Sequence, residues 1–322
     1  MKNKVKVFLF FICVFFFSGV FSLATAGQEK GCHLKIGVTL HPYYSWVKNI
    51  VGDRAEVIPI IPPNTDPHSY QPTPKDMAVL NDIDVLVVNN LGHDEFIKPM
   101  LKAVNRKDLV IIDTSKGLPL IPVQRHVYAF EKDSANNQVA YNSHTYISIT
   151  GSIQQIQNIA RQLGRLCPED AKIFRKNSRA YARRLRKMLA NALHQLENVD
   201  TTDLRIATVH DGYAYLFQEL GVEVAAVVQP RHGIEPTPRQ LEDTIKRIKR
   251  AKVNILFTEL DYKKKYVDII YKETGCRIYS LSHISNGPYS ADFFEKCMKK
   301  NLDTIVKALT ESSSHGEHAK SA

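Results

Sequence analysis

Short apolar runs rich in β-branched residues alternate with helical patterns, and this alternation limits the fold of the chain more than any other feature. The first series has strand patterns at residues 34–39, 57–61, 84–88 and 109–112, with helical patterns at 46–51, 74–80 and 95–104. The second has strand patterns at 204–209, 223–228, 253–257 and 277–279, with helical patterns at 213–220, 238–251, 264–274 and 291–309. This order is typical of parallel sheets covered by helices, so we predict two α/β lobes.

The segment between the two series predicts a single long helix. It opens with Pro168, which suits a first helical turn, and residues 169–198 contain neither Gly nor Pro. Its apolar residues recur on one stripe. A helix over residues 168–198 would be about 46 Å long, so we expect a rigid backbone helix that joins the lobes and leaves a cleft between them.

The N-terminus has the three-part order of a secretory signal. Three Lys residues stand among the first six positions, an apolar run covers residues 7–17, and Ala24 and Ala26 supply the small residues of a cleavage site. The apolar run is shorter than the roughly 20 residues that span a bilayer. We therefore predict export to the periplasm, with a signal peptide at residues 1–26 that is cleaved.

These patterns set the expected boundaries of the protein. We predict a signal peptide at 1–26, an N-terminal α/β lobe at 27–167, the linking helix at 168–199, a C-terminal α/β lobe at 200–311 and a disordered polar tail at 312–322.

The chain is mildly basic, with 43 Lys and Arg against 33 Asp and Glu. The excess gathers near Arg179, Arg186 and Lys187 and again over residues 246–250. In a cytosolic chain such clusters would favour nucleic-acid binding. For an exported protein we expect solvated helix faces and no nucleic-acid partner.

Four cysteines remain after residue 26, and no two of them form a CxxC pair, so a thiolate metal site is disfavoured. Cys276 ends a late strand and Cys297 lies on the closing helix, so these two could meet. Cys32 and Cys167 have no evident neighbours in the sequence.

The positions of the histidines, 12 in all, are the main functional signal. His68 lies in a proline-rich loop, His144 precedes a helix, and His210 and His283 follow strands of the second lobe. Ligands of parallel α/β proteins gather where strands end. If the lobes face each other, these rings could converge as neutral imidazoles, which suit Zn²⁺; the alternative is scattered structural histidines.

Several motifs together resemble a known family, the zinc- and manganese-binding solute receptors of ABC uptake transporters (ZnuA/TroA type). The resemblance extends over roughly residues 34–309. It rests on Asp66-Pro67-His68-Ser69-Tyr70-Gln71-Pro72-Thr73-Pro74-Lys75-Asp76, the His144 segment, His210-Asp211-Gly212-Tyr213, Leu220-Gly221-Val222, Glu235-Pro236-Thr237-Pro238 and Ile255-Leu256-Phe257-Thr258-Glu259. It implies two lobes, a long joining helix and one metal ion between the lobes.

The resemblance also implies a set of ligands. The family's first three ligands fall on His68, His144 and His210. A His at the third position, where manganese-type members usually have Glu, favours Zn²⁺ over Mn²⁺ or Fe²⁺. The family often has an Asp after the last strand, where this chain has Ser282 and then His283; we take His283 as the fourth ligand, with Glu259 or a water as alternatives.

The expected function is therefore a monomeric periplasmic receptor that delivers Zn²⁺ to an ABC permease in the inner membrane and is not an enzyme. One alternative is an exported zinc hydrolase with three His and a water, for which Glu259 is the only evident base and no HExxH helix is present. The other is a metal-binding adhesin on the same scaffold.

Overall fold

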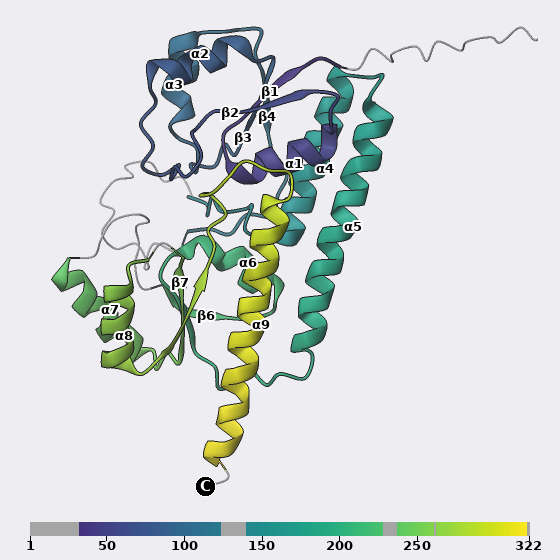
Figure 1. Cartoon of the computed structure of the whole chain (residues 1–322). Coiled ribbons are helices and arrows are strands. Elements are labelled where there is room, and N and C mark those ends of the chain that lie inside the picture. The colour runs from purple at the N-terminus through teal and green to yellow at the C-terminus, as the bar shows by residue number, and fades with distance from the viewer. Residues whose placement is uncertain (1–31, 124–139, 228–236, 261, 321–322) are drawn as a thin grey trace, which may run out of the picture. The chain divides into compact units, whose positions relative to one another are not determined.

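The structure is a computed structural model that describes residues 32–123, 140–227, 237–260 and 262–320 (Figure 1). The predicted signal peptide, residues 1–26, lies outside the described residues. Within the described ranges, none of the helices combines the length and the apolar character needed to cross a membrane.

Two four-stranded sheets, each entirely parallel, confirm the predicted α/β lobes. The first sheet has the order β2-β1-β3-β4 and the second has the order β6-β5-β7-β8, so both lobes repeat one arrangement. The strands are β1 (Lys35–Val38), β2 (Glu56–Pro59), β3 (Val85–Val88), β4 (Val110–Asp113), β5 (Ile206–Thr208), β6 (Val224–Val227), β7 (Ile255–Glu259) and β8 (Arg277–Leu281). All four residues of β3 are buried, as expected of an inner strand covered on both faces.

The helices follow local start and stop signals. They are α1 (His41–Val51), α2 (Pro74–Asp82), α3 (Ile97–Val104), α4 (Ile149–Leu166), α5 (Ala171–Leu196), α6 (Ala214–Glu219), α7 (Pro238–Arg250), α8 (Lys264–Thr274) and α9 (Phe293–Lys320), with the short 3₁₀ helix η1 (Asp211–Tyr213) before α6. α7 begins at a proline behind a capping box of Thr237 and Gln240. α8 ends at Gly275, whose left-handed backbone suits glycine.

The joining helix is α5, which has 26 residues and is about 39 Å long. It is shorter than predicted because the chain turns at Asp170, whose buried carboxylate accepts hydrogen bonds from the backbone N of Cys32 (2.8 Å) and from Arg54 (2.6 Å). α5 contacts α1 and α4 and also runs beside α9 (Figure 1). It therefore packs against both lobes along its length.

A second connection ties the lobes together. After β8 the chain crosses to α1 before it enters α9. Ser45 of α1 donates a hydrogen bond to the carbonyl of Ser290 in the crossing segment (2.7 Å). His41 of α1 bonds to the carbonyl of Gly287 (3.0 Å) and stacks on Tyr289, with ring centroids 4.2 Å apart. One apolar core continues across both lobes, where Trp46 meets Phe294 edge to face. This packing holds the lobes at two places, which agrees with a rigid connection.

The structure describes a helix over most of the segment that we expected to be a disordered tail at 312–322, and residues 321–322 lie outside the described residues. α9 continues as a helix to Lys320. Residues such as Leu302, Ile305 and Leu309 anchor this helix in the core. Extending an existing helix costs far less than nucleating one, so the polar residues after Ser312 continue it.

The structure also corrects the suggested pairing of the cysteines. Cys32 and Cys167 form a disulfide with their Cα atoms 5.7 Å apart, whereas Cys276 and Cys297 are free. Cys32 lies just before β1 and Cys167 caps α4, so the bond fixes the start of the first lobe to the turn before α5. No local pattern could indicate a pair 135 residues apart.

Candidate metal centre

Four histidines from separate loops meet at one point between the lobes. His68 and His144 come from the first lobe, and His210 and His283 come from the second. One ring nitrogen of each can be chosen so that all four lie within 4.8 Å of one another. His144, His210 and His283 are buried, while His68 is exposed to solvent. The cluster is thus open on the His68 side.

Strand ends position these rings, as the parallel-sheet rule predicts. His68 follows β2 in a turn in which Asp66 accepts a hydrogen bond from the His68 backbone N (3.0 Å). His210 follows β5 and immediately precedes η1, and His283 follows β8. His210 and His283 therefore lie directly beside the second sheet, whereas His68 lies in the connection between β2 and α2 and His144 lies shortly before α4.

The spacing of the nitrogens suits a small cation. The Nε2 atoms of His144 and His210 are 3.0 Å apart. The ring of His283 lies 4.9 Å from that of His144 and 5.4 Å from that of His210, between centroids. A tetrahedral ion with metal–nitrogen distances of about 2.0–2.1 Å spaces its ligands by about 3.4 Å. Small movements would bring the four nitrogens to that spacing.

Asn142 sets the orientation of His144. Its amide group donates to the carbonyl oxygen of Asp211 (2.7 Å) and to the Asp211 carboxylate (3.1 Å). Its carbonyl oxygen is then left to accept from Nδ1 of His144 (2.9 Å). With the proton on Nδ1, the lone pair of Nε2 points into the cluster, where a metal can use it. The contact also joins the two lobes beside the cluster.

Two hydroxyl groups contact Nδ1 of His283. Its Nδ1 lies 2.9 Å from the hydroxyl of Ser285 and 3.3 Å from the hydroxyl of Tyr146. The next residue, Ile284, has φ of 61°, an uncommon value for a β-branched side chain. Asn301 on α9 stabilises this turn by accepting from the backbone N of Ser282 (2.7 Å) and donating to its carbonyl (2.8 Å).

Gly212 forms the floor of the cluster. A Cβ atom at this position would lie 2.9 Å from the ring of His210, 3.1 Å from Nε2 of His283 and 3.3 Å from the ring of His144. Any side chain would push at least one ring away. The glycine therefore allows three imidazoles to approach one point.

His93 and the alternative ligand Glu259 lie outside the group of four. His93 is buried against the cluster, with its ring 4.2 Å from that of His68 and its Nε2 2.8 Å from the hydroxyl of Tyr146. Glu259, at the end of β7, is not among the four residues whose ligand atoms converge. In the described part of the chain, that converging group consists of imidazoles alone.

Burial and the neighbouring rings control the charge of His144. Loss of solvent, followed by the nearby His210 and His93, holds the pKa of His144 well below its ordinary value of 6.5. The imidazole is thus neutral at pH 7, which is the form that binds metal.

The supporting residues were missed at the sequence level. Asn142 lies two residues before His144 and bonds to its backbone N (3.0 Å), a local turn that an Asn at this spacing could have indicated. Tyr146 and Asn301 carry no such signal because their contacts join distant segments.

Comparisons with known proteins agree with this architecture. The ZnuA family model, described as the periplasmic component A of a zinc-uptake complex, matches residues 36–308. The metal ABC transporter substrate-binding lipoprotein FimA of Streptococcus parasanguinis is 25% identical over 321 residues, covering 97% of this chain and 100% of FimA. The high-affinity zinc uptake system protein ZnuA of Bacillus subtilis is 24% identical over 290 residues, covering 88% of this chain and 90% of that protein.

The solved structures include a relative whose sequence is more similar to this chain than those of FimA and ZnuA. The SBP FpvC of Pseudomonas aeruginosa, in complex with Mn²⁺, superposes with a TM-score of 0.79 at 45% identity, covering 87% of this chain and 99% of FpvC. FpvC has also been solved with Ni²⁺, and other relatives are named for manganese or iron.

These relatives are named as metal-binding substrate-binding proteins and not as enzymes, so the hydrolase alternative is not favoured. The chain belongs to the ZnuA family, the metal-binding substrate-binding proteins of ABC transporters.

Proposed function

We propose that this protein captures Zn²⁺ in the periplasm with His68, His144, His210 and His283 and delivers it to an ABC permease. The observation that carries the proposal is the convergence of four imidazoles without a carboxylate among them. Imidazole ligands suit Zn²⁺, whereas Mn²⁺ prefers oxygen ligands. Fe²⁺, which also accepts imidazole ligands, is the second candidate. Because relatives are named for iron and for manganese, both ions should be compared with Zn²⁺.

Metal competition tests the choice of ion. Protein stripped with a chelator should bind Zn²⁺ at least about a hundredfold more tightly than Mn²⁺, because Mn²⁺ stands lowest in the affinity order of first-row ions. Titration calorimetry with each ion, and then with both, measures the ratio. Equal affinities, or tighter binding of Mn²⁺, would contradict the proposed cargo.

The proposed delivery requires a partner in the membrane. Substrate-binding proteins of ABC transporters work with a membrane permease. We propose that this chain does so as a monomer in the periplasm after its signal peptide is removed. The packing of α5 and of the crossing segment against both lobes favours docking as one rigid body.

Asn142 offers a test of ligand orientation. Asn142→Ala should lower Zn²⁺ affinity by about 10-fold to 100-fold, because Nδ1 of His144 would lose the acceptor that fixes its tautomer. Titration calorimetry at neutral pH measures the change. Asn177→Ala is the matched control, since Asn177 bonds to the carbonyl of Ile50 away from the cluster. A similar loss in both variants would contradict the orienting role.

Acid should release the metal. Each ligand must be neutral to bind, and burial holds the pKa of His144 below 6.5. Affinity should therefore change little above about pH 6.5 and fall at lower pH. The same lowered pKa means that the unfolded chain takes up a proton before the folded chain does, so the metal-free protein should also lose stability below about pH 6.5. Zn²⁺ titrations across this range measure the effect, and an unchanged affinity at about pH 5 would contradict imidazole ligation.

A further inference from the structure

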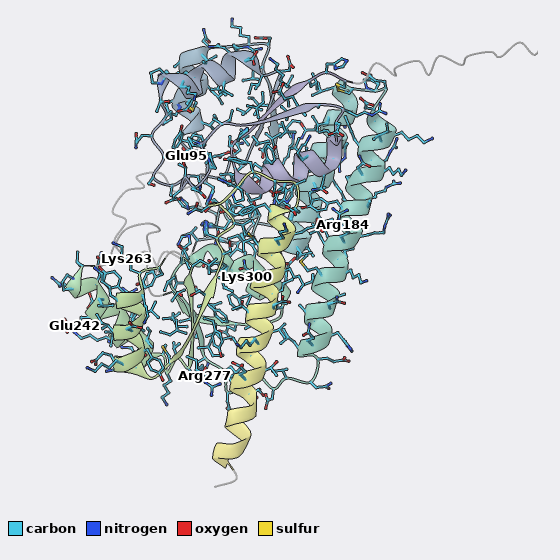
Figure 2. All side chains as sticks on the ribbon, in the orientation of Figure 1. Glu95, Arg184, Glu242, Lys263, Arg277 and Lys300 are labelled. Atoms are coloured by element: carbon cyan, nitrogen blue, oxygen red, sulfur yellow. A yellow bond between two sulfur atoms is a disulfide. The ribbon has the colours of Figure 1, made fainter. Side chains whose placement is uncertain are left out.

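The outer side of α5 carries a run of positive charges of which, among the described residues, Arg184 alone is paired with an acidic side chain. Its 26 residues contain no acidic side chain. They contain eight basic ones: Lys172, Arg175, Lys176, Arg179, Arg183, Arg184, Arg186 and Lys187. Figure 2 shows long side chains projecting outward along this helix. We call these eight residues the α5 strip, which extends over about 22 Å.

At one end of the α5 strip, two turns of α4 add further arginines. A hollow of about 490 Å³ between α4 and α5 is lined by Arg161, Arg165, Arg175 and Arg179, and no acidic side chain lines it. Its floor consists of small residues, since Gly164 packs so closely on Ala171 that an added Cβ would lie 3.2 Å from the Ala171 Cβ. We call this hollow, together with its four arginines, the arginine hollow.

The arginine hollow lacks charge compensation from the described residues. All four side chains are exposed, and none of them forms an ion pair with a described acidic residue. Arg161 donates a hydrogen bond only to the neutral Asn158 (3.3 Å). Four like charges around one hollow repel each other, so an anionic partner would relieve the repulsion.

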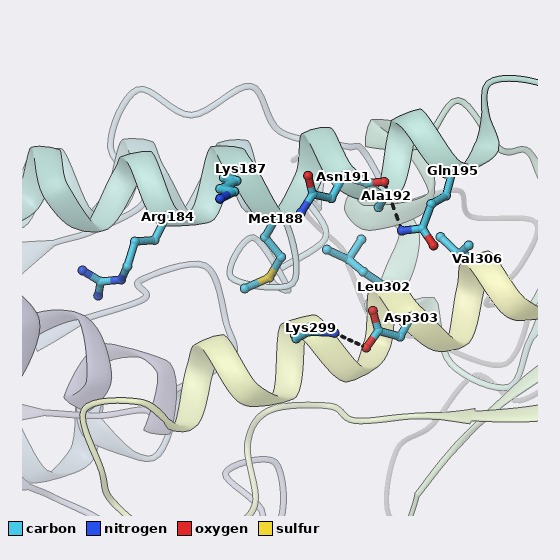
Figure 3. A pocket seen from close by; sticks show the side chains of 10 residues that line it. All are labelled: Arg184, Lys187, Met188, Asn191, Ala192, Gln195, Lys299, Leu302, Asp303 and Val306. Carbon is cyan, nitrogen blue, oxygen red and sulfur yellow. Dashed lines mark hydrogen bonds and ion pairs between the residues drawn. The ribbon is translucent and has the colours of Figure 1, made fainter.

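In other basic regions of the chain, basic side chains form ion pairs with acidic ones. In the groove between α5 and α9, Lys299 pairs with Asp303 (2.5 Å), as Figure 3 shows, and nearby Arg184 pairs with Glu295 (2.9 Å). On α7, Lys246 pairs with Glu242 (2.6 Å) and Lys249 lies near Glu273 (3.6 Å). The second basic cluster of the sequence therefore contains ion pairs at Lys246 and Lys249, whereas Arg184 is the one residue of the α5 strip that pairs with a described acidic residue.

The chemistry of the surface points to phosphate. Guanidinium groups bind phosphate oxygens through two parallel hydrogen bonds, and a hollow of this size accommodates a headgroup. A protein interface would need an apolar centre. In these two fully described helices, the exposed large apolar side chains are Leu166 and Leu193 alone, and the aromatic rings of Phe174 and Tyr181 are buried.

We propose that the arginine hollow and the α5 strip form a binding surface for anionic phospholipid headgroups. A phosphate group would occupy the hollow, and the remaining basic side chains would lie along the membrane surface. Such attraction would concentrate the receptor near the membrane that contains its permease. The proposal concerns residues outside the histidine cluster and does not depend on which metal is bound.

Vesicle sedimentation tests the proposal with the mature chain from Gly27. Vesicles of phosphatidylglycerol and phosphatidylcholine should bind the protein at low salt, and vesicles of phosphatidylcholine alone should not. High salt should abolish the binding, because exposed charges are screened. The variant R161Q/R165Q/R175Q/R179Q should bind at least about tenfold less, since each charge near an anionic surface contributes separately.

A matched variant removes four charges from α7: K246Q/R247Q/K249Q/R250Q. It should retain vesicle binding within about threefold, because α7 lies outside the arginine hollow and two of these four charges, Lys246 and Lys249, are already paired with acidic residues. Circular dichroism and thermal unfolding verify that both variants are folded. Inorganic phosphate at equal ionic strength should not displace the vesicles; displacement would assign the hollow to a free phosphate ion instead.

Three further results would overturn the proposal. One is the absence of wild-type binding to the anionic vesicles, and another is an equal loss of binding in both variants. The third is binding to polyglutamate without binding to vesicles, which would assign the surface to an acidic protein.

Discussion

Replacing His144 by alanine is expected to weaken Zn²⁺ binding by about two orders of magnitude. Four-ligand zinc sites provide about 10–16 kcal/mol of binding free energy, so one ligand accounts for about 3 kcal/mol. His144 is buried and its Nε2 lies 3.0 Å from Nε2 of His210, so solvent cannot readily replace it as a ligand. His210→Ala should give a loss of the same size. Competition with a chelator of known affinity measures both.

His194→Ala is the control for this prediction. His194 is exposed on α5, where it lies 3.2 Å from Glu197 and far along the helix from the cluster. Its removal should leave Zn²⁺ affinity unchanged. If His194→Ala weakened binding as much as His144→Ala, the cleft would not be the principal metal site.

Loss of the disulfide should produce the largest change in stability. The bond closes a loop between Cys32 and Cys167, which are 135 residues apart. The chain-entropy account gives about 5 kcal/mol for such a loop, and 2–4 kcal/mol is the usual experimental range. The double variant Cys32→Ser/Cys167→Ser should therefore unfold at markedly lower denaturant concentration. Urea unfolding followed by circular dichroism measures the difference in free energy.

A reducing agent provides the matched comparison. Reduction should destabilise the wild-type protein to about the level of the double variant and should not change the double variant. Because Cys276 and Cys297 are both free thiols, they give reduction no second target. Destabilisation of the double variant by the reducing agent would contradict the assigned pairing.

Elements with local signals were predictable from the sequence. α8 has the predicted bounds because Gly275 ends it, and α7 begins at Pro238 behind its capping box. α1 begins at His41, five residues earlier than the predicted helix. Its first turn contains aromatic residues of modest helix propensity, and the turn is stabilised by contacts with the crossing segment, such as His41 on Tyr289.

The histidine cluster was predictable in part for a related reason. His210 and His283 follow strands of a parallel sheet, and that rule alone places them at one edge. The turn between Asn142 and His144 is local and could have been predicted. The contacts between distant segments could not, because Asn142 meets Asp211 across 69 residues and Tyr146 meets His283 across 137. Such contacts depend on how the two lobes pack against each other, and local sequence patterns do not predict this packing.

Anomalous diffraction from crystals of the protein grown with Zn²⁺ tests the central claim most directly. We predict one strong zinc peak, surrounded by nitrogens of His68, His144, His210 and His283 at about 2.0–2.1 Å. A peak elsewhere, or no peak among these four rings, would contradict the assignment of the histidine cluster as the metal site.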